Sequence, residues 1–190
     1  MKRRAAITLT GAVLALGLWS MTAYSADDEE KQARLEAQKA ILKLADSMRE
    51  NKGDTKAQAA AIKKKFDELQ PLMWIYKPKN KGGIGMKDGA GIELELGRLG
   101  GPKARLTPAK IADLKLDLVK AAEISKAIAE ISDLYAPKKD TAKWKGYNKE
   151  MRKAADELIE ATKGGNPMQV KRAINNLNAS CTNCHGDFRE

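Results

Sequence analysis

Two cysteines and a histidine near the end of the chain have the spacing of a chemically active site. Cys181 and Cys184 are separated by Thr182 and Asn183, and His185 follows directly, so the run reads C-x-x-C-H. Two thiols at this spacing can add to the vinyl groups of a haem, and the adjacent imidazole can then bind the haem iron. The chain has no other cysteine or histidine. We therefore expect one covalently bound haem c, with His185 as an axial iron ligand.

Two other kinds of site use the same residue types. A redox-active C-x-x-C dithiol normally lies in a βαβ unit, whereas this chain shows helical patterns. A structural zinc ion normally has four Cys or His ligands, and this chain contains three such residues. Both remain alternatives to haem, and the dithiol would make the protein a thiol-disulfide enzyme. We expect a protein that is not an enzyme, because no hydrolytic or group-transfer constellation accompanies the motif.

The first residues have the pattern of a secretory signal peptide. Three cations at positions 2–4 precede an uncharged run, and the small residues Ala23 and Ser25 mark a cleavage site. We expect residues 1–25 to be removed in the periplasm, where this type of haem attachment takes place. Residues 26–190 would then form the haem-binding domain, without a stable membrane span. Because the uncharged run is long enough to cross a bilayer, an uncleaved anchor is the alternative.

The composition is that of a chain of long helices. Its 190 residues are 43% hydrophobic but only 5% aromatic, and they suit one domain with an extension. The formal net charge is +10, of which the predicted leader carries three charges, so the mature chain has +7. A basic protein can attract an acidic partner, but solvated helix faces with an excess of Lys are our preferred explanation. Nucleic acid is not expected as a partner of an exported chain.

Apolar residues recur at spacings of three and four in five segments, which is typical of helices. The predicted helices cover residues 27–51, 55–76, 107–135, 141–163 and about 167–188. Pro71 would kink the second helix or end it early. Between the second and third helices, residues 77–106 are rich in Gly and Lys, and we predict a loop. A flap over one haem edge is its preferred role, and a plain solvent loop is the alternative.

The last helix carries the motif on its apolar face. Val170, Ile174, Leu177, Cys181 and Cys184 follow one another at spacings of four, three, four and three. A haem bound to these cysteines must therefore lie between this helix and its neighbours. Short links imply antiparallel neighbours, so we predict an all-α antiparallel bundle with haem inside it.

The C-terminal half resembles the class II cytochromes c, which comprise cytochrome c-prime and related low-spin bundle cytochromes. The ending Cys181–Arg189 is similar to the family's haem motif, followed by an aromatic residue and Arg. Trp144–Met151 and Ile128–Pro137 look like its third helix and the end of its second. The resemblance is strongest over residues 107–190. It implies a four-helix bundle, here with an additional N-terminal helical segment and a Gly-rich insertion.

An up-down-up-down bundle of this kind also places residues around the haem. Phe188 should pack on the haem edge. Arg189 either interacts with a propionate or is an exposed terminal charge. The end of the second helix and the start of the third supply four more neighbours, which are Leu134, Tyr135, Trp144 and Tyr147.

The second axial position of the iron cannot be filled by histidine, because the chain has no second one. A Met thioether, a Lys amine and an empty site are the options. Met73 is the first candidate and Met48 the second. Both fall late in their predicted helices, which puts them far from the haem in an up-down-up-down bundle. Either one reaches the iron only if its helix runs in the direction opposite to that arrangement. Met86 is a third candidate, and Met151 is expected in the core. Each of these methionines is also explained as an ordinary core or loop residue.

Two functions fit these observations. The first is an exported monohaem cytochrome that transfers one electron, with a Met ligand that raises its reduction potential. The alternative is a five-coordinate protein that binds NO or CO, as cytochrome c-prime members do. The redox partner is not identified by the sequence, and a homodimer is expected only by the resemblance.

Overall fold

The computed structural model describes residues 26–189, and every regular element in this part of the chain is a helix. The predicted signal peptide lies outside the described residues. Among the described helices, none has the length and hydropathy that a membrane crossing requires. The α-helices are α1 (Ala26–Arg49), α2 (Thr55–Lys65), α3 (Gln70–Met73), α4 (Ile92–Gly100), α5 (Pro108–Ser132), α6 (Thr141–Gly164) and α7 (Pro167–Phe188). Three short 3-10 helices are η1 (Trp74–Tyr76), η2 (Lys79–Lys81) and η3 (Asp133–Tyr135).

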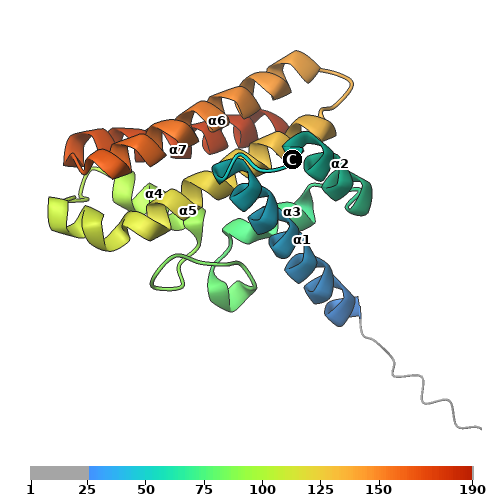
Figure 1. Ribbon diagram of the computed structural model, residues 1–190, viewed down its shortest axis with the longest axis horizontal. Helices are drawn as coiled ribbons and strands as arrows, with labels where there is room; N and C mark the ends of the chain where they lie inside the picture. Colours follow the sequence, from blue (N-terminus) through green and yellow to red (C-terminus); the bar gives the residue numbers. More distant parts are fainter. Residues whose placement is uncertain (1–25, 190) are drawn as a thin grey trace, which may run out of the picture.

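Four long helices, α1, α5, α6 and α7, build the bundle. Helices α5, α6 and α7 lie side by side along the long axis of the molecule, and α1 crosses α5 (Figure 1). The short helix α4 packs on α7, whereas α2 and α3 pack on α1. The predicted all-α bundle with an additional N-terminal segment is confirmed.

Helix α5 supplies the centre of the core. Seven of its apolar residues recur every three or four positions, as in a helix with one inward face, and all of them are buried: Ile111, Leu114, Leu118, Ala121, Ile124, Ile128 and Ile131. Burial of one such side chain stabilises the fold by about 1.5–3 kcal/mol. The helical pattern therefore predicted this part of the core correctly.

Local capping explains where α5 and α7 begin. The Thr107 hydroxyl accepts a hydrogen bond from the Lys110 backbone N–H at 3.2 Å, and Pro108 is the first helical residue. Asn166 caps α7 in the same way and accepts from two backbone N–H groups. Gly165 ends α6 with φ +69°, a conformation that glycine adopts without strain.

The segment predicted as one helix over residues 55–76 is divided. Helix α2 ends at Lys65, because Phe66 has an extended conformation (φ −119°, ψ 107°). Pro71 lies in the first turn of α3 and does not kink a longer helix. The break allows α3 and η1 to turn back onto α1, where Leu72 and Ile75 are fully buried.

The prediction of a loop was wrong for part of residues 77–106, because α4 forms there. Ile92, Leu96 and Leu99 lie on its buried face. Gly100 allows α4 to approach α7 closely, since a Cβ atom there would lie 3.3 Å from the Ile174 side chain. Burial of this apolar face outweighs the low helix propensity of glycine.

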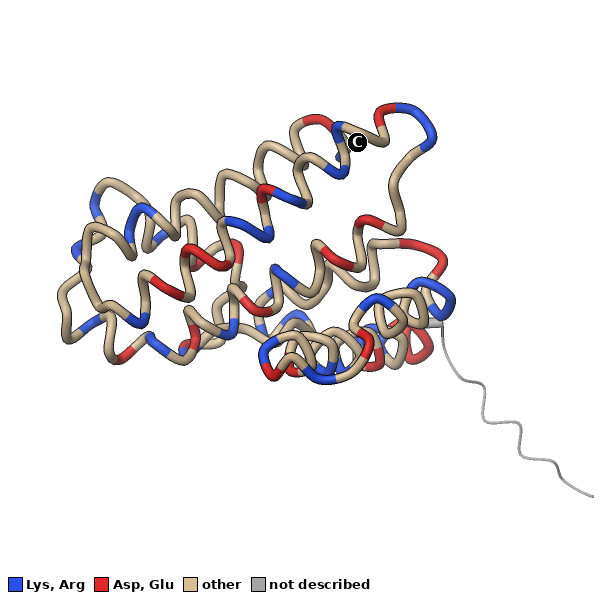
Figure 2. Tube along the Cα trace, turned by 45° about the horizontal axis from the view of Figure 1, so that its top comes forward, with Lys and Arg blue, Asp and Glu red and all other residues tan. Residues whose placement is uncertain are grey.

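Charged residues are mixed along the helices. Lys and Arg are interspersed with Asp and Glu along the Cα trace and do not form a block of one sign (Figure 2). Ion pairs such as Lys126–Asp156, at 2.7 Å, connect neighbouring helices. This arrangement agrees with the interpretation of the net charge as an excess of Lys on solvated helix faces.

Candidate functional site

The C-x-x-C-H motif forms the last turns of α7. Cys181, Cys184 and His185 line one cavity with a volume of about 600 Å³. Small-molecule sites in proteins have volumes of roughly 300–1,000 Å³, so the cavity has the size of a cofactor site. Neither cysteine is in a disulfide. Both thiols and the imidazole are thus available to a single occupant.

Burial makes the two thiols poor redox catalysts. It raises the pKa of the Cys181 thiol to about 11, and it also raises the pKa of Cys184. Redox-active cysteines have lowered pKa values, because the thiolate is the reacting form. The protein environment shifts these two thiols in the opposite direction, which does not favour the thiol-disulfide alternative.

A zinc site is not favoured either. Across residues 26–189, no group of three or more His, Cys, Asp and Glu side chains is arranged to hold a metal ion. Zinc also accepts carboxylate ligands, and Glu93 lines the cavity, but this residue forms no such group with the motif residues.

Helix α6 forms the second wall of the cavity through Trp144, Asn148 and Met151. The Trp144 indole donates from Nε1 to the Ser132 carbonyl oxygen at 2.7 Å, and its ring meets that of Phe188 edge to face at 5.0 Å between centroids. These contacts hold the end of α5, the start of α6 and the end of α7 together around the cavity.

Asn148 is the buried polar residue of this wall, with 1% of its surface exposed. Its Nδ2 donates to Asp133 Oδ1 at 2.8 Å, and Asp133 Oδ2 accepts from Arg152 Nη1 at 2.8 Å. One carboxylate therefore satisfies the amide and pairs with the guanidinium. This network fixes the first turns of α6 relative to the end of α5.

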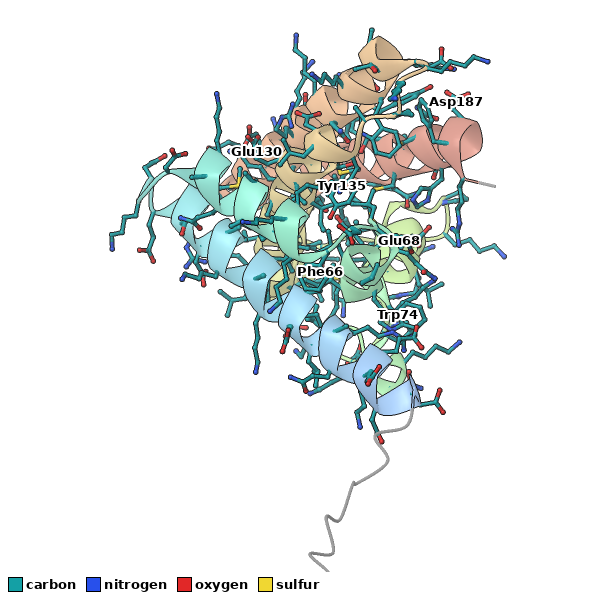
Figure 3. The ribbon with its side chains drawn as sticks, turned by 90° about the vertical axis from the view of Figure 1, so that its right-hand side faces the viewer. Phe66, Glu68, Trp74, Glu130, Tyr135 and Asp187 are labelled. Carbon is teal, nitrogen blue, oxygen red and sulfur yellow. The ribbon has the colours of Figure 1, made fainter. Side chains whose placement is uncertain are left out.

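A second polar cluster holds the last turn of α7. Tyr147 donates its hydroxyl hydrogen to Asp187, and Lys143 Nζ lies 2.9 Å from the same carboxylate. These two partners hold the pKa of Asp187 below its ordinary value, with the tyrosine hydrogen bond as the first cause. Figure 3 shows Asp187 at the outer end of this helix pair. The cluster keeps the turn that contains His185 against α6.

The third wall is formed by residues 69–77, which we call the wall segment. Six of its residues line the cavity: Leu69, Gln70, Met73, Trp74, Tyr76 and Lys77. Tyr76 is partly buried against the core, and its hydroxyl donates to Ser125 Oγ at 3.2 Å, which anchors the segment to α5. Burial raises the pKa of Tyr76 far above its ordinary value, so this hydroxyl stays protonated.

The structure places only some of the predicted haem neighbours at the cavity. Met73, Trp144, Phe188 and Arg189 line it together with the C-x-x-C-H residues. Tyr147 is not among the lining residues, but its ring meets that of Phe188 edge to face, with 6.2 Å between the ring centroids.

Several other candidates lie elsewhere. Leu134 is 45% exposed, and the Tyr135 hydroxyl donates to the Phe66 carbonyl oxygen. Both residues belong to η3. Ser132, which directly precedes η3, lines the cavity, whereas Leu134 and Tyr135 do not. Met48 and Met86 are not among the lining residues.

Sequence reasoning missed most of the wall segment, and it also missed Asn148 as a lining residue. Met151 was expected in the core; it is 6% exposed and also lines the cavity. Helical spacing carried a usable signal for α6, because these two residues follow Trp144 by four and seven positions. No comparable signal existed for the wall segment, since its position depends on the break after α2.

The residues of the cavity fit a haem group. Two free thiols and an imidazole come from α7, and eight of the fifteen other lining residues are aromatic residues, Leu or Met. Lys77 and Arg189 provide two cations, as the carboxylates of a haem would require. Cysteine and histidine are the residue types that hold haem in c-type sites, and the Met73 thioether lines the same cavity.

Comparison with known proteins agrees with this chemistry. The family model described as Cytochrome C' matches residues 134–189. This region contains η3, α6, α7 and the complete C-x-x-C-H motif. No curated protein and no solved structure matches the chain.

Proposed function

We propose that this protein, a member of the class II cytochrome c-prime family by its match over residues 134–189, is an exported monohaem cytochrome that transfers single electrons. The family implies a haem cofactor. The covalent attachment, the electron transfer and the export are our proposals. The attachment and the electron transfer are supported chiefly by one observation: both thiols, His185 and Met73 line the same cavity of about 600 Å³. Export is supported by the leader pattern of residues 1–25.

Each cavity residue has a defined task in this proposal. Cys181 and Cys184 hold the cofactor by two thioether bonds, and His185 binds the iron from α7. When bound, the haem supplies an iron that accepts or releases one electron. Trp144 and Phe188 cover its edge and limit the access of water, which affects the reduction potential.

We propose that Met73 would supply a second protein ligand to the haem iron. Among the described methionines, Met73 and Met151 line the cavity. Met151 is packed into the core with 6% of its surface exposed, whereas Met73 is partly buried beside the core and faces the cavity. A thioether ligand raises the reduction potential of a haem and suits electron transfer.

Covalent attachment is tested by producing the full chain with its leader in a bacterial host that attaches haem c. We expect a periplasmic protein that begins at Ala26 and keeps its haem after denaturation. The double variant Cys181→Ser/Cys184→Ser should lose covalent haem, whereas Thr182→Ser, an exposed change within the motif, should keep it. A wild-type protein without covalent haem, made under these conditions, would refute the proposed function.

Optical spectra then separate the two candidate functions. With Met73 on the iron, we expect a low-spin spectrum with a far-red methionine-to-iron band and slow reaction with CO. Met73→Leu should remove the band and bind CO rapidly, and Met151→Leu should change neither property. A wild-type protein that is already high-spin and reacts rapidly with CO would instead support gas binding.

A further inference from the structure

The wall segment is anchored on both sides of Met73. On the N-terminal side, Leu72 is fully buried and α3 packs on α1. On the C-terminal side, Ile75 is fully buried and Tyr76 is hydrogen-bonded to Ser125 of α5. Met73 itself makes no hydrogen bond through its side chain, so its position depends on these neighbours.

Trp74 connects the wall segment to two other parts of the chain. The Arg34 guanidinium of α1 lies 3.4 Å from the centroid of the Trp74 ring, which is a cation–π contact. Trp74 Nε1 also donates to the Lys81 carbonyl oxygen at 2.6 Å. Figure 3 shows Trp74 beside the N-terminal half of α1. The residue after Met73 is therefore held from both sides.

Residues 78–91, which we call the glycine loop, pack directly on the backbone of the wall segment. A Cβ atom at Gly83 would lie 1.8 Å from the Lys77 carbonyl oxygen, and one at Gly91 would lie 2.7 Å from the Tyr76 carbonyl oxygen. Any larger residue would have to push these backbones apart. This close backbone contact explains the glycine at positions 83 and 91.

Backbone hydrogen bonds strengthen this contact. Ile84 N–H donates to the Ile75 carbonyl oxygen at 3.3 Å, which connects the glycine loop to η1. Within the loop, Lys79 N–H donates to the Gly89 carbonyl oxygen at 2.9 Å, which closes the loop on itself. The side chain of Gln38 on α1 also donates to the Gly82 carbonyl oxygen. The glycine loop is thus tied to α1 as well as to the wall segment.

We propose that the glycine loop and Trp74 are positioning elements that hold Met73 on the haem iron and thereby decide whether the iron is six- or five-coordinate. This inference rests on the proposed function. Gly83 and Gly91 do not line the cavity, so they act through the wall segment. The loop serves as the support of a ligand-bearing segment, and loosening it opens the iron to external ligands.

The test compares three variants of the haem-loaded protein. Gly83→Ala introduces the close contact with Lys77. Trp74→Phe removes the Nε1 donor but keeps a ring for Arg34. Gly164→Ala is the matched control, because a Cβ atom at this helical glycine would meet nothing within 4 Å. The readouts are the haem content, the far-red methionine band and the rate of CO binding to the reduced protein.

Gly83→Ala and Trp74→Phe should retain covalent haem but show a weaker methionine band. Trp74→Phe loses one hydrogen bond of ordinary strength, which raises the open population by about two- to tenfold, so its CO binding should accelerate by the same factor. Gly164→Ala should match the wild type. If Gly83→Ala does not accumulate, Trp74→Phe decides the outcome alone.

The inference would be overturned if Gly83→Ala and Trp74→Phe both had the methionine band intensity and the CO-binding rate of the wild type. It would also be overturned by a wild-type protein without the methionine band. Neither result affects the haem assignment, because covalent haem is measured separately. Absence of covalent haem from the wild type would instead refute the proposed function itself.

Discussion

Asp133 offers the sharpest test of how the cavity wall is held in place. Its carboxylate accepts from the Asn148 amide and from the Arg152 guanidinium, each at 2.8 Å. Asp133→Ala would leave the Asn148 side chain buried without this partner. Arg152 would keep its hydrogen bond to the Ala129 carbonyl oxygen at 3.1 Å.

The expected loss of stability follows from these two contacts. A buried polar group without its partner costs about 1–3 kcal/mol. The Asp133–Arg152 pair adds at most about 1 kcal/mol, because both side chains are about one quarter exposed. We expect a decrease of about 2–3 kcal/mol in the free energy of unfolding. For a domain of this size, that lowers Tm by roughly 4–12 °C.

The assay is urea unfolding of the haem-bearing protein, followed by far-UV circular dichroism. Asp156→Ala is the matched control, because Asp156 also joins α6 to α5, through Lys126, but its side chain is 54% exposed. The free energy of unfolding of that variant should decrease by less than about 0.5 kcal/mol. Asp133→Asn keeps an oxygen acceptor for Asn148 and should lie between the two. Equal unfolding midpoints for Asp133→Ala and Asp156→Ala would refute the reasoning.

Three further predictions concern stability. Thr162 is 2% exposed, and its hydroxyl has no hydrogen-bond partner among the described residues; Thr162→Val should therefore stabilise the protein by about 1 kcal/mol in urea unfolding. Leu118→Ala, at a fully buried site, should cost about 2–5 kcal/mol, whereas Leu116→Ala, at an 84% exposed site on the same helix, should change stability by less than about 0.5 kcal/mol. Lys87 holds the pKa of Asp113 below its ordinary value, so the stability from this pair is fully present above that ordinary value and is lost as the pH falls through the lowered pKa; Asp113→Asn should therefore differ from the wild type at pH 7 and approach it in strong acid.

Each of these predictions has a contrary outcome. A less stable Thr162→Val protein would mean that the hydroxyl has a favourable interaction. Similar losses for Leu118→Ala and Leu116→Ala would contradict the assignment of the core. A difference between Asp113→Asn and the wild type that grows as the pH falls would contradict the sign of the pKa shift.

Local patterns in the sequence predicted much of this protein. The spacing of Cys181, Cys184 and His185 predicted a haem protein, and the family match over residues 134–189 supports this prediction. Apolar periodicity predicted α5, α6 and α7, since this signal acts within a few turns of one helix.

The same reasoning failed where distant parts of the chain meet. The sequence did not reveal α4, whose glycines argue against a helix until its apolar face is buried on α7. It named Leu134 and Tyr135 as haem neighbours, whereas the turn at η3 directs Ser132 to the cavity. It placed Met73 late in a helix that the structure divides at Phe66.

The sequence by itself determined the motif, the main helices and the apolar face that carries both cysteines. Tertiary structure alone decided that the wall segment forms the third wall of the cavity and that the glycine loop supports it. The physical reason is the range of the interactions. Helix periodicity and capping depend on neighbours in the sequence, whereas the contact of Trp74 with Arg34, across 40 positions of the chain, exists only after α3 has folded back onto α1.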